Sequence, residues 1–403
     1  MQKQSSSIFP IAVLVAALGY FVDIYDLLLF NIVRIPSLTS LGLSEDAADK
    51  SGQFIISVQM TGLLIGGIVW GIMGDKKGRL SVLFGSIILY SVANVFNGFV
   101  HTVNEYALVR FFAGIGLAGE LGAGITLVSE LVHKDKRGLS TSMVAGIGLT
   151  GAIVAYFISR EFDWRICYFI GGGLGLCLLV LRISVFESGM FTQVKKMKLA
   201  RGNFFMFFNR ASRFKKYLFS ILIGLPTWYV IGVLVAFSNK FGKEFGLTEK
   251  INPGKATMYA YIAISIADVL IGFVSQWLKS RKKALYIFYA LTIVMLILYF
   301  TQSDTNTTTM YWIIAGLGFA TGFWAIFVTM AAEQFGTNLR ATAATTVPNM
   351  VRGSLPLVIL LFNGLQNLKL SYVTAGWVTG SIVMTISIIA AWFTEETFGK
   401  DLD

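Results

Sequence analysis

The sequence is short of charged residues, histidines and cysteines for its length. Only 14% of its 403 residues are charged, whereas soluble globular domains carry about 25%. Its two cysteines, Cys167 and Cys177, lie in one apolar segment, which argues against a disulfide framework or a thiolate metal site. Its two histidines, His101 and His133, fall at the ends of apolar segments, and the chain has no nucleophile–base set or cluster of metal ligands. These deficits argue against an enzyme, and we expect neither a metal nor a cofactor.

Hydrophobic residues are abundant, at 55% of the chain, and the mean hydropathy is +0.69. They gather into segments of about 18–25 residues, the length that a helix needs to cross ~30 Å of hydrocarbon. The sequence therefore predicts an all-α membrane protein with twelve transmembrane helices. The expected spans are 8–32, 53–73, 80–100, 104–131, 139–159, 165–185, 217–238, 256–278, 284–301, 310–332, 342–364 and 372–393.

The longest charged connection, residues 187–216, divides these helices into two sets of six. We expect an N-terminal six-helix bundle over 1–186, a cytoplasmic linker over 187–216 and a C-terminal six-helix bundle over 217–403. The net charge of +11 does not indicate nucleic-acid binding, because the basic residues sit in short loops between apolar spans. Twenty-one of the 33 Lys and Arg residues lie in the termini and loops on one side, against nine on the other. This bias predicts that both termini are cytoplasmic.

The two halves of the chain also resemble each other in sequence. Glu130 and Arg137 in "SELVHKDKRG" match Glu333 and Arg340 in "AEQFGTNLRA", and "GDKKGR" matches the basic "WLKSRK" at the same offset. An internal duplication is typical of transporters built from two related bundles, with the substrate site between the bundles near the membrane midplane.

Ionisable residues inside the expected spans are candidates for the site. Each costs roughly 2.5–3.5 kcal/mol on insertion scales, so an intramembrane charge marks a functional site by default. Six stand out: Asp23, Asp26, Arg110, Glu120, Asp268 and Arg352.

Asp23 and Asp26, in "GYFVDIYDLLLF", are three residues apart and therefore lie on one face of a helix. Two carboxylates this close repel each other when both are ionised, so the pair favours a state in which one holds a proton. Such a pair is suited to proton coupling. The alternative is that Asp26 forms a fixed ion pair with Arg110, at a similar depth, and only Asp23 is functional. Glu120 is either a second protonation site or a buried, hydrogen-bonded acid.

Arg352 lies between Pro348 and Pro356, where a bent helix would expose backbone near a cavity. Its guanidinium is suited to binding a substrate carboxylate through two hydrogen bonds. The alternative is a permanent bridge to Asp268, which lies at a similar depth, and both hold if substrate opens the bridge. The further candidates for substrate contact are Tyr25, Trp228, Tyr229, Trp324 and Asn349.

Several motifs carry a resemblance to a known family. "GDKKGR" after the second span resembles the loop signature G-x-x-x-D-[RK]-x-G-[RK]-[RK] of the major facilitator superfamily, with Leu80 at the last basic position. "RFFAGIGLAGE" is similar to the R-x-x-x-G-x-G motif of that superfamily's fourth helix. "FESGMF" and "EETFGKDL" resemble signatures of its sugar and metabolite symporters. "DIYD" resembles the first-helix D-G-x-D motif of metabolite:proton symporters, with Ile24 replacing the glycine. The sequence as a whole, especially "GDKKGRLSVLFGS" and "FESGMF", also resembles the phagosomal transporter family of intracellular bacteria, whose members import amino acids or nucleosides.

The resemblance implies two six-helix bundles in a bacterial inner membrane and proton-coupled uptake of a small polar metabolite by alternating access. An amino acid or another carboxylate-bearing solute is favoured. The alternatives are a nucleoside or an aromatic acid as substrate, or efflux by proton antiport. We expect a monomer whose partners are the solute, protons and the bilayer, with no nucleic acid. Charges at the cytoplasmic helix ends are expected to latch the bundles: Asp75, Arg79, Glu130, Arg137, Glu333 and Arg340.

Overall fold

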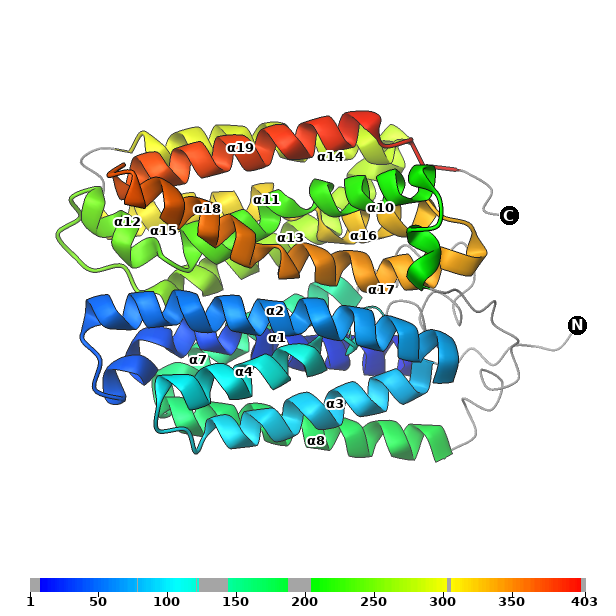
Figure 1. Ribbon diagram of the computed structural model, residues 1–403, viewed down its shortest axis with the longest axis horizontal. Helices are drawn as coiled ribbons and strands as arrows, with labels where there is room; N and C mark the ends of the chain where they lie inside the picture. Colours follow the sequence, from blue (N-terminus) through cyan, green and yellow to red (C-terminus); the bar gives the residue numbers. More distant parts are fainter. Residues whose placement is uncertain are drawn as a thin grey trace, which may run out of the picture.

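The computed structural model describes residues 8–77, 79–120, 122, 144–187, 204–302 and 306–399. The helices of these ranges run along the long axis of the molecule (Figure 1). The first half contributes α1 (Ile8–Ser40), α2 (Glu45–Lys77), α3 (Arg79–Asn97), α4 (Val103–Leu117), α7 (Gly151–Glu161) and α8 (Trp164–Glu187). The second half begins with a short 3₁₀ helix (Phe204–Phe207), followed by α10 (Ala211–Ile223), α11 (Leu225–Tyr229), a π-helix (Val230–Val235), α12 (Ser238–Glu244), α13 (Pro253–Leu278), α14 (Arg281–Phe300), α15 (Thr307–Ala320), α16 (Trp324–Glu333), α17 (Thr337–Gly353), α18 (Leu355–Asn367) and α19 (Tyr372–Phe393).

The predicted all-α membrane fold is confirmed. Ten stretches of the described chain are long and apolar enough to cross a membrane, and α3 and α4 complete the twelve expected spans. Helices satisfy their own backbone groups, which is what hydrocarbon demands of a spanning segment. The predicted boundaries differ mostly at helix ends: α1 and α2 extend well beyond 8–32 and 53–73, and α4 ends at Leu117. Residues 123–143, where the expected fourth helix ends and the fifth begins, lie outside the described part.

Side-chain caps set the starts of several helices. The N-cap residue of each accepts a hydrogen bond from the backbone N–H three residues on, a contact that contributes about 1 kcal/mol. Helices α4, α13, α14, α15 and α19 begin in this way, at Thr102, Asn252, Ser280, Asn306 and Ser371.

The two halves meet along α2, which packs against α17 and α18, and along α1 and α7, which pack against α13. Figure 1 shows the two groups of helices one above the other, with α2 and α17 facing across the boundary. The approach is close enough to require glycine, since a Cβ added at Gly67 would lie 2.7 Å from the Cβ of Asn349. Asn349 also donates a hydrogen bond of 2.7 Å to the carbonyl of Ala118 in the first half. The linker expected between the halves stays a prediction, because residues 188–203 lie outside the described part.

Three spans of the second half are interrupted. The sequence predicts continuous helices over 217–238 and 310–332, and a bend near Arg352 in the span over 342–364. The first breaks at Gly224 before Pro226, the second at 321–323 and the third at Ser354 before Pro356. Proline has no N–H to donate and clashes with the preceding turn, so it starts a helix more readily than it continues one. These breaks put irregular backbone part-way along three spans.

Candidate functional site

The centre of the molecule holds an ion pair between the two halves. Asp23 on α1 and Arg352 on α17 approach to 3.7 Å between Oδ2 and Nη1, and their side chains are 0% and 1% exposed. This distance is too long for a hydrogen bond. Among the described residues, neither oxygen of Asp23 has a hydrogen-bond partner, and neither do Nε and Nη1 of Arg352. Both charges are therefore buried, yet they retain most of their capacity to bind other groups.

Two tryptophans flank Arg352. Its Cζ lies 5.8 Å from the ring centroid of Trp228 and 5.7 Å from that of Trp324, and the two rings are 6.4 Å apart. Ring faces attract a cation, and more strongly where water is excluded. Neither indole N–H has a hydrogen-bond partner among the described residues. The centre thus combines one guanidinium with two indole donors whose bonding capacity is unused.

The interrupted helices position these three side chains. Trp228 lies on α11 just before the π-helix, Trp324 is the first residue of α16, and Arg352 lies in the last turn of α17. Irregular backbone at membrane depth is tolerated where protein buries it or where it lines a cavity, and transporter sites are often built at such points. The breaks in three separate spans therefore mark one place between the halves.

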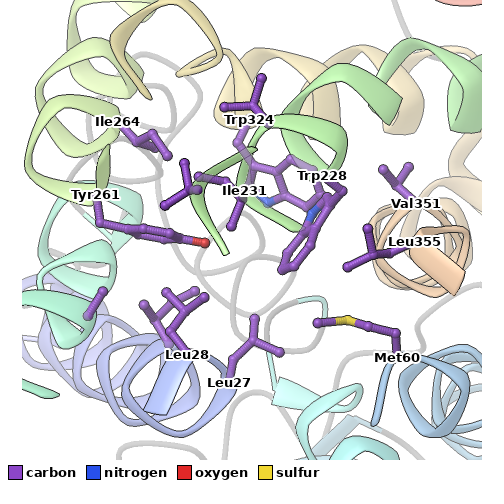
Figure 2. Packing of buried hydrophobic residues seen from close by; sticks show 14 of the residues in the cluster. Leu27, Leu28, Met60, Trp228, Ile231, Tyr261, Ile264, Trp324, Val351 and Leu355 are labelled. Carbon is purple, nitrogen blue, oxygen red and sulfur yellow. The ribbon is translucent and has the colours of Figure 1, made fainter. Parts of the chain in front are cut away.

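Apolar side chains surround this group. Figure 2 shows Leu27, Leu28 and Met60 of the first half facing Trp228 and Tyr261 of the second. All five are at most 4% exposed. A low-dielectric wall with a few convergent polar groups is the usual composition of a small-molecule site. It also strengthens every electrostatic interaction inside it.

Asp268 has a different partner from the one predicted. Its Oδ1 accepts a hydrogen bond of 2.8 Å from the backbone N–H of Ala325, in the first turn of α16. The predicted alternative, a bridge from Arg352 to Asp268, is wrong within the described residues, where Arg352 pairs with Asp23. The physical reason is the break at 321–323, which frees N–H groups at the start of α16, and these groups attract a carboxylate. Asp268 therefore holds the helix that carries Trp324.

The second aspartate of the first helix is bound through one carboxylate oxygen, since Oδ2 of Asp26 has no hydrogen-bond partner among the described residues. Asp26 Oδ1 lies 2.8 Å from Nη1 of Arg110, and both side chains are 0% exposed. Arg110 also donates to the backbone carbonyl of Asp26 at 3.0 Å, to Asn94 at 3.1 Å and to Gln59 at 3.2 Å. The ion pair that the sequence offered as an alternative is present. Asp23 faces the other half, whereas Asp26 is bound within its own.

Glu120 forms a second ion pair within the first half. Both of its oxygens accept hydrogen bonds from the guanidinium of Arg182 on α8, at 3.1 Å for the longer one. The two side chains are 1% and 5% exposed. Of the two expectations for Glu120, the geometry is that of a buried, hydrogen-bonded acid.

Comparison with known proteins adds the family. A family model of the Major Facilitator Superfamily matches residues 16–354. The chain belongs to this superfamily. It is therefore a multi-pass membrane transporter of small molecules and not an enzyme.

The superfamily relatives include the niacin transporter NiaP of Acinetobacter baylyi, 24% identical over 430 residues, which cover 96% of this chain and 94% of that protein. The gentisate transporter of Corynebacterium glutamicum is 24% identical over 351 residues, covering 82% of this chain and 76% of the other. Among solved structures, the partially occluded inward-open xylose transporter XylE from E. coli is similar with a TM-score of 0.70 and 19% identity. That match covers 98% of this chain and 100% of XylE.

Two of the aromatic residues predicted to contact substrate have their hydroxyl groups engaged elsewhere. Tyr25 donates to the carbonyl of Cys167 at 2.9 Å, and Tyr229 donates to the carbonyl of Gly376 at 2.6 Å. Each bond lies within one half. Trp228 and Trp324, by contrast, lie beside Arg352, so the structure brings together two of the four predicted aromatic contacts.

The predicted cytoplasmic latch is only partly described. Glu130 and Arg137 lie outside the described residues, and so do the side chains of Asp75 and Arg79. Glu333, at the end of α16, lies 3.5 Å from Arg281 and accepts a hydrogen bond of 2.6 Å from Thr397. Arg340 lies on α17. The gating role of all six residues stays a prediction.

Some residues near the site were missed by sequence reasoning. Tyr261 faces the centre from α13, and Asn94 and Gln59 complete the bonds of Arg110. Uncharged polar residues are common in spans, so nothing in their type marked them. Arg182 lies near the end of an expected span and is not among the six candidates, although a buried arginine needs a carboxylate partner and Glu120 is available.

Proposed function

We propose that this transporter carries a small carboxylate-bearing solute into a bacterial cell together with a proton. We call the end of the molecule that holds the α1–α2 and α12–α13 connections the distal end, because it lies away from the two chain termini (Figure 1). The distal end would face outwards, and both termini would lie in the cytoplasm. The observation that carries the proposal is the Asp23–Arg352 pair, buried between the halves with unused hydrogen-bonding capacity on both sides. Because the path lies within one chain, a monomer suffices.

Competition for Arg352 supplies the coupling. The guanidinium can neutralise Asp23 or the carboxylate of a solute, and in a low-dielectric site it cannot serve both anions equally well. A proton taken up by Asp23 removes this competitor and leaves Arg352 to the solute. Proton and solute would then be bound together, and loss of the proton inside the cell would return Arg352 to Asp23 and release the solute.

The aromatic walls favour a flat carboxylate among the solutes left open by the sequence. Trp228 and Trp324 offer ring surface and two indole donors beside the guanidinium. The names of relatives agree in chemistry, since niacin and gentisate are both ring carboxylates. We therefore place an aromatic or heteroaromatic monocarboxylate ahead of an amino acid.

Proteoliposomes test the proposal directly. With an acidic exterior, nicotinate or benzoate should accumulate, and a protonophore should abolish the accumulation. Nicotinamide, which has the same ring without the carboxylate, is the matched control and should not accumulate. Accumulation driven by a sodium gradient without a pH gradient would overturn proton coupling, and equal accumulation of nicotinamide would overturn the carboxylate site.

A further inference from the structure

A second cluster of charges joins the two halves at the distal end. Its centre is Asp49 on α2, whose side chain is 6% exposed. Asp49 lies 3.0 Å from Nη2 of Arg34 on α1, within its own half. From the other half it accepts hydrogen bonds of 3.1 and 3.2 Å from Asn239, and it lies 3.2 Å from Nζ of Lys240. One carboxylate is thus bound by both halves at once.

Three further contacts extend the cluster. Lys240 forms an ion pair with Asp46 of the first half. Arg34, which is 0% exposed, donates to Asn239 at 3.4 Å and lies 4.5 Å from the ring of Phe237. Partial burial disfavours the charge of Lys240, but its bonds to Asp46 and Asp49 raise its pKa above the ordinary value. The lysine therefore stays charged and the cluster stays paired.

A cavity of about 800 Å³ lies at the same end. Asp49, Asn239 and Lys240 belong to its lining, together with residues of both halves such as Ile32 and Ile251, but Asp23 and Arg352 do not. The cluster therefore lies where this distal cavity borders the interior, and it ties α2 to α12 there.

We propose that Arg34, Asp46, Asp49, Asn239 and Lys240 form a distal gate, which must break before a solute can pass between this cavity and the centre. The inference needs only a transporter with two moving halves. It does not depend on the solute or on proton coupling.

Buried charge is suited to such a gate. The attraction between two buried ions roughly offsets the free-energy cost of removing them from water. Separating them when the gate opens therefore costs little free energy, because water then solvates each ion. An apolar seal would instead lose about 25 cal/mol for each Å² that opening exposes. Removing Asp49 is different, because it leaves the buried Arg34 unpaired in the closed state and so favours the open one. Removing Lys240 takes away the charged partner that Asp49 has in the other half, which also weakens the closed state.

Thiol labelling tests the gate without any substrate. The reporter is Leu27→Cys, at a position that is 1% exposed and faces the other half (Figure 2), in a background with Cys167→Ser and Cys177→Ser. A membrane-impermeant maleimide is added at the distal face. Lys240→Ala should raise the labelling rate severalfold, and Asp49→Asn should do the same because Arg34 loses its buried partner.

Lys250→Ala is the matched control. Lys250 also pairs across the halves, with Glu45 at 2.8 Å, but these side chains are 82% and 64% exposed. Exposed pairs contribute little, so labelling should stay at the parent rate. Lys240→Arg should restore slow labelling, which separates the gate from a folding defect. Equal labelling rates in Lys240→Ala, Lys250→Ala and the parent would overturn the proposal.

Discussion

At the scale of single residues, the two aspartates of α1 are three positions apart and have different environments. Asp26 is bound by Arg110 in its own half, whereas Asp23 faces Arg352 across the boundary with no hydrogen bond among the described residues. Sequence reasoning found both aspartates and both arginines, because a charge in an apolar span is conspicuous. It could not assign every pair, since depth along a helix says little about the face on which a neighbouring helix presents its charge.

The two aspartates should therefore differ in their effect on stability. Asp26→Asn leaves Arg110 buried with one charge unpaired, a loss of about 3–5 kcal/mol. Asp23→Asn also leaves a buried guanidinium without its anion, but the contact that it breaks is 3.7 Å long and includes no hydrogen bond, so the melting temperature should fall less. Thermal unfolding of the two purified variants measures the difference. A double variant, Asp26→Asn with Arg110→Gln, should recover part of the loss, and equal melting temperatures for the two single variants would contradict this account.

At the scale of elements, the length of an apolar segment predicts that it forms a helix, but it does not predict where that helix breaks. The span over 310–332 was expected to be continuous, and it is interrupted just before Trp324. In the span over 342–364 a bend near Arg352 was expected, and the helix breaks at Ser354. A proline in a span allows a break without requiring one, and the break at 321–323 contains no proline. Asp268 could be assigned to the start of α16 only once that break was known.

The glycines of α8 offer a test of packing. A Cβ at Gly175 would overlap Ser91 Oγ and lie 3.0 Å from Tyr90 Cε2, whereas a Cβ at Gly173, two residues away, would meet nothing within 4 Å. Gly175→Ala should cost about 1–3 kcal/mol through overpacking. Gly173→Ala should leave stability unchanged or slightly raised, because alanine favours the helix. Thermal unfolding compares the two, and a milder effect at Gly175 than at Gly173 would show that α3 and α8 pack differently.

The segment after α19 offers a test by pH. Although partial burial opposes ionisation, Glu396 accepts hydrogen bonds from Ser280 and from the N–H groups of Phe398, Arg281 and Lys282, which lower its pKa from 4.5 to about 2. A lowered pKa contributes stability above pH 4.5, and this contribution is lost as the pH falls towards 2.

The melting temperature of the parent should therefore exceed that of Glu396→Gln by a constant amount above about pH 5, and the gap should narrow below pH 4.5. Glu395→Gln is the control, since Glu395 is 55% exposed and pairs with Lys216 at 3.3 Å on the surface. It should show little effect at any pH. If the difference in melting temperature between the parent and Glu396→Gln widened on acidification, folding would raise the pKa of Glu396 and this account would be wrong.

At the scale of the whole molecule, the internal duplication and the long charged connection predicted two bundles, and the described helices form two groups that meet along α2 and α17. The substrate site predicted between them stays a proposal. The distal gate was not predicted, because Arg34, Lys240 and Asp49 lie in or near loops where charged residues are ordinarily solvated. Only the approach of two distant segments buries them. The sequence thus identified the central charges, whereas contacts that depend on how the halves close became visible only in three dimensions.

The central claim is that Asp23 and the solute compete for Arg352, and Asp23→Asn tests it most directly. Asparagine imitates the protonated acid, so the variant should bind the solute and exchange it in counterflow. Because no proton is taken up or released, an acidic exterior should no longer drive accumulation above the external concentration. Arg352→Ala should lose both counterflow and accumulation. The measurement is pH-driven uptake compared with counterflow in proteoliposomes, with nicotinate or benzoate as the solute. Retained exchange with accumulation lost is the predicted result, and normal pH-driven accumulation by Asp23→Asn would contradict the account.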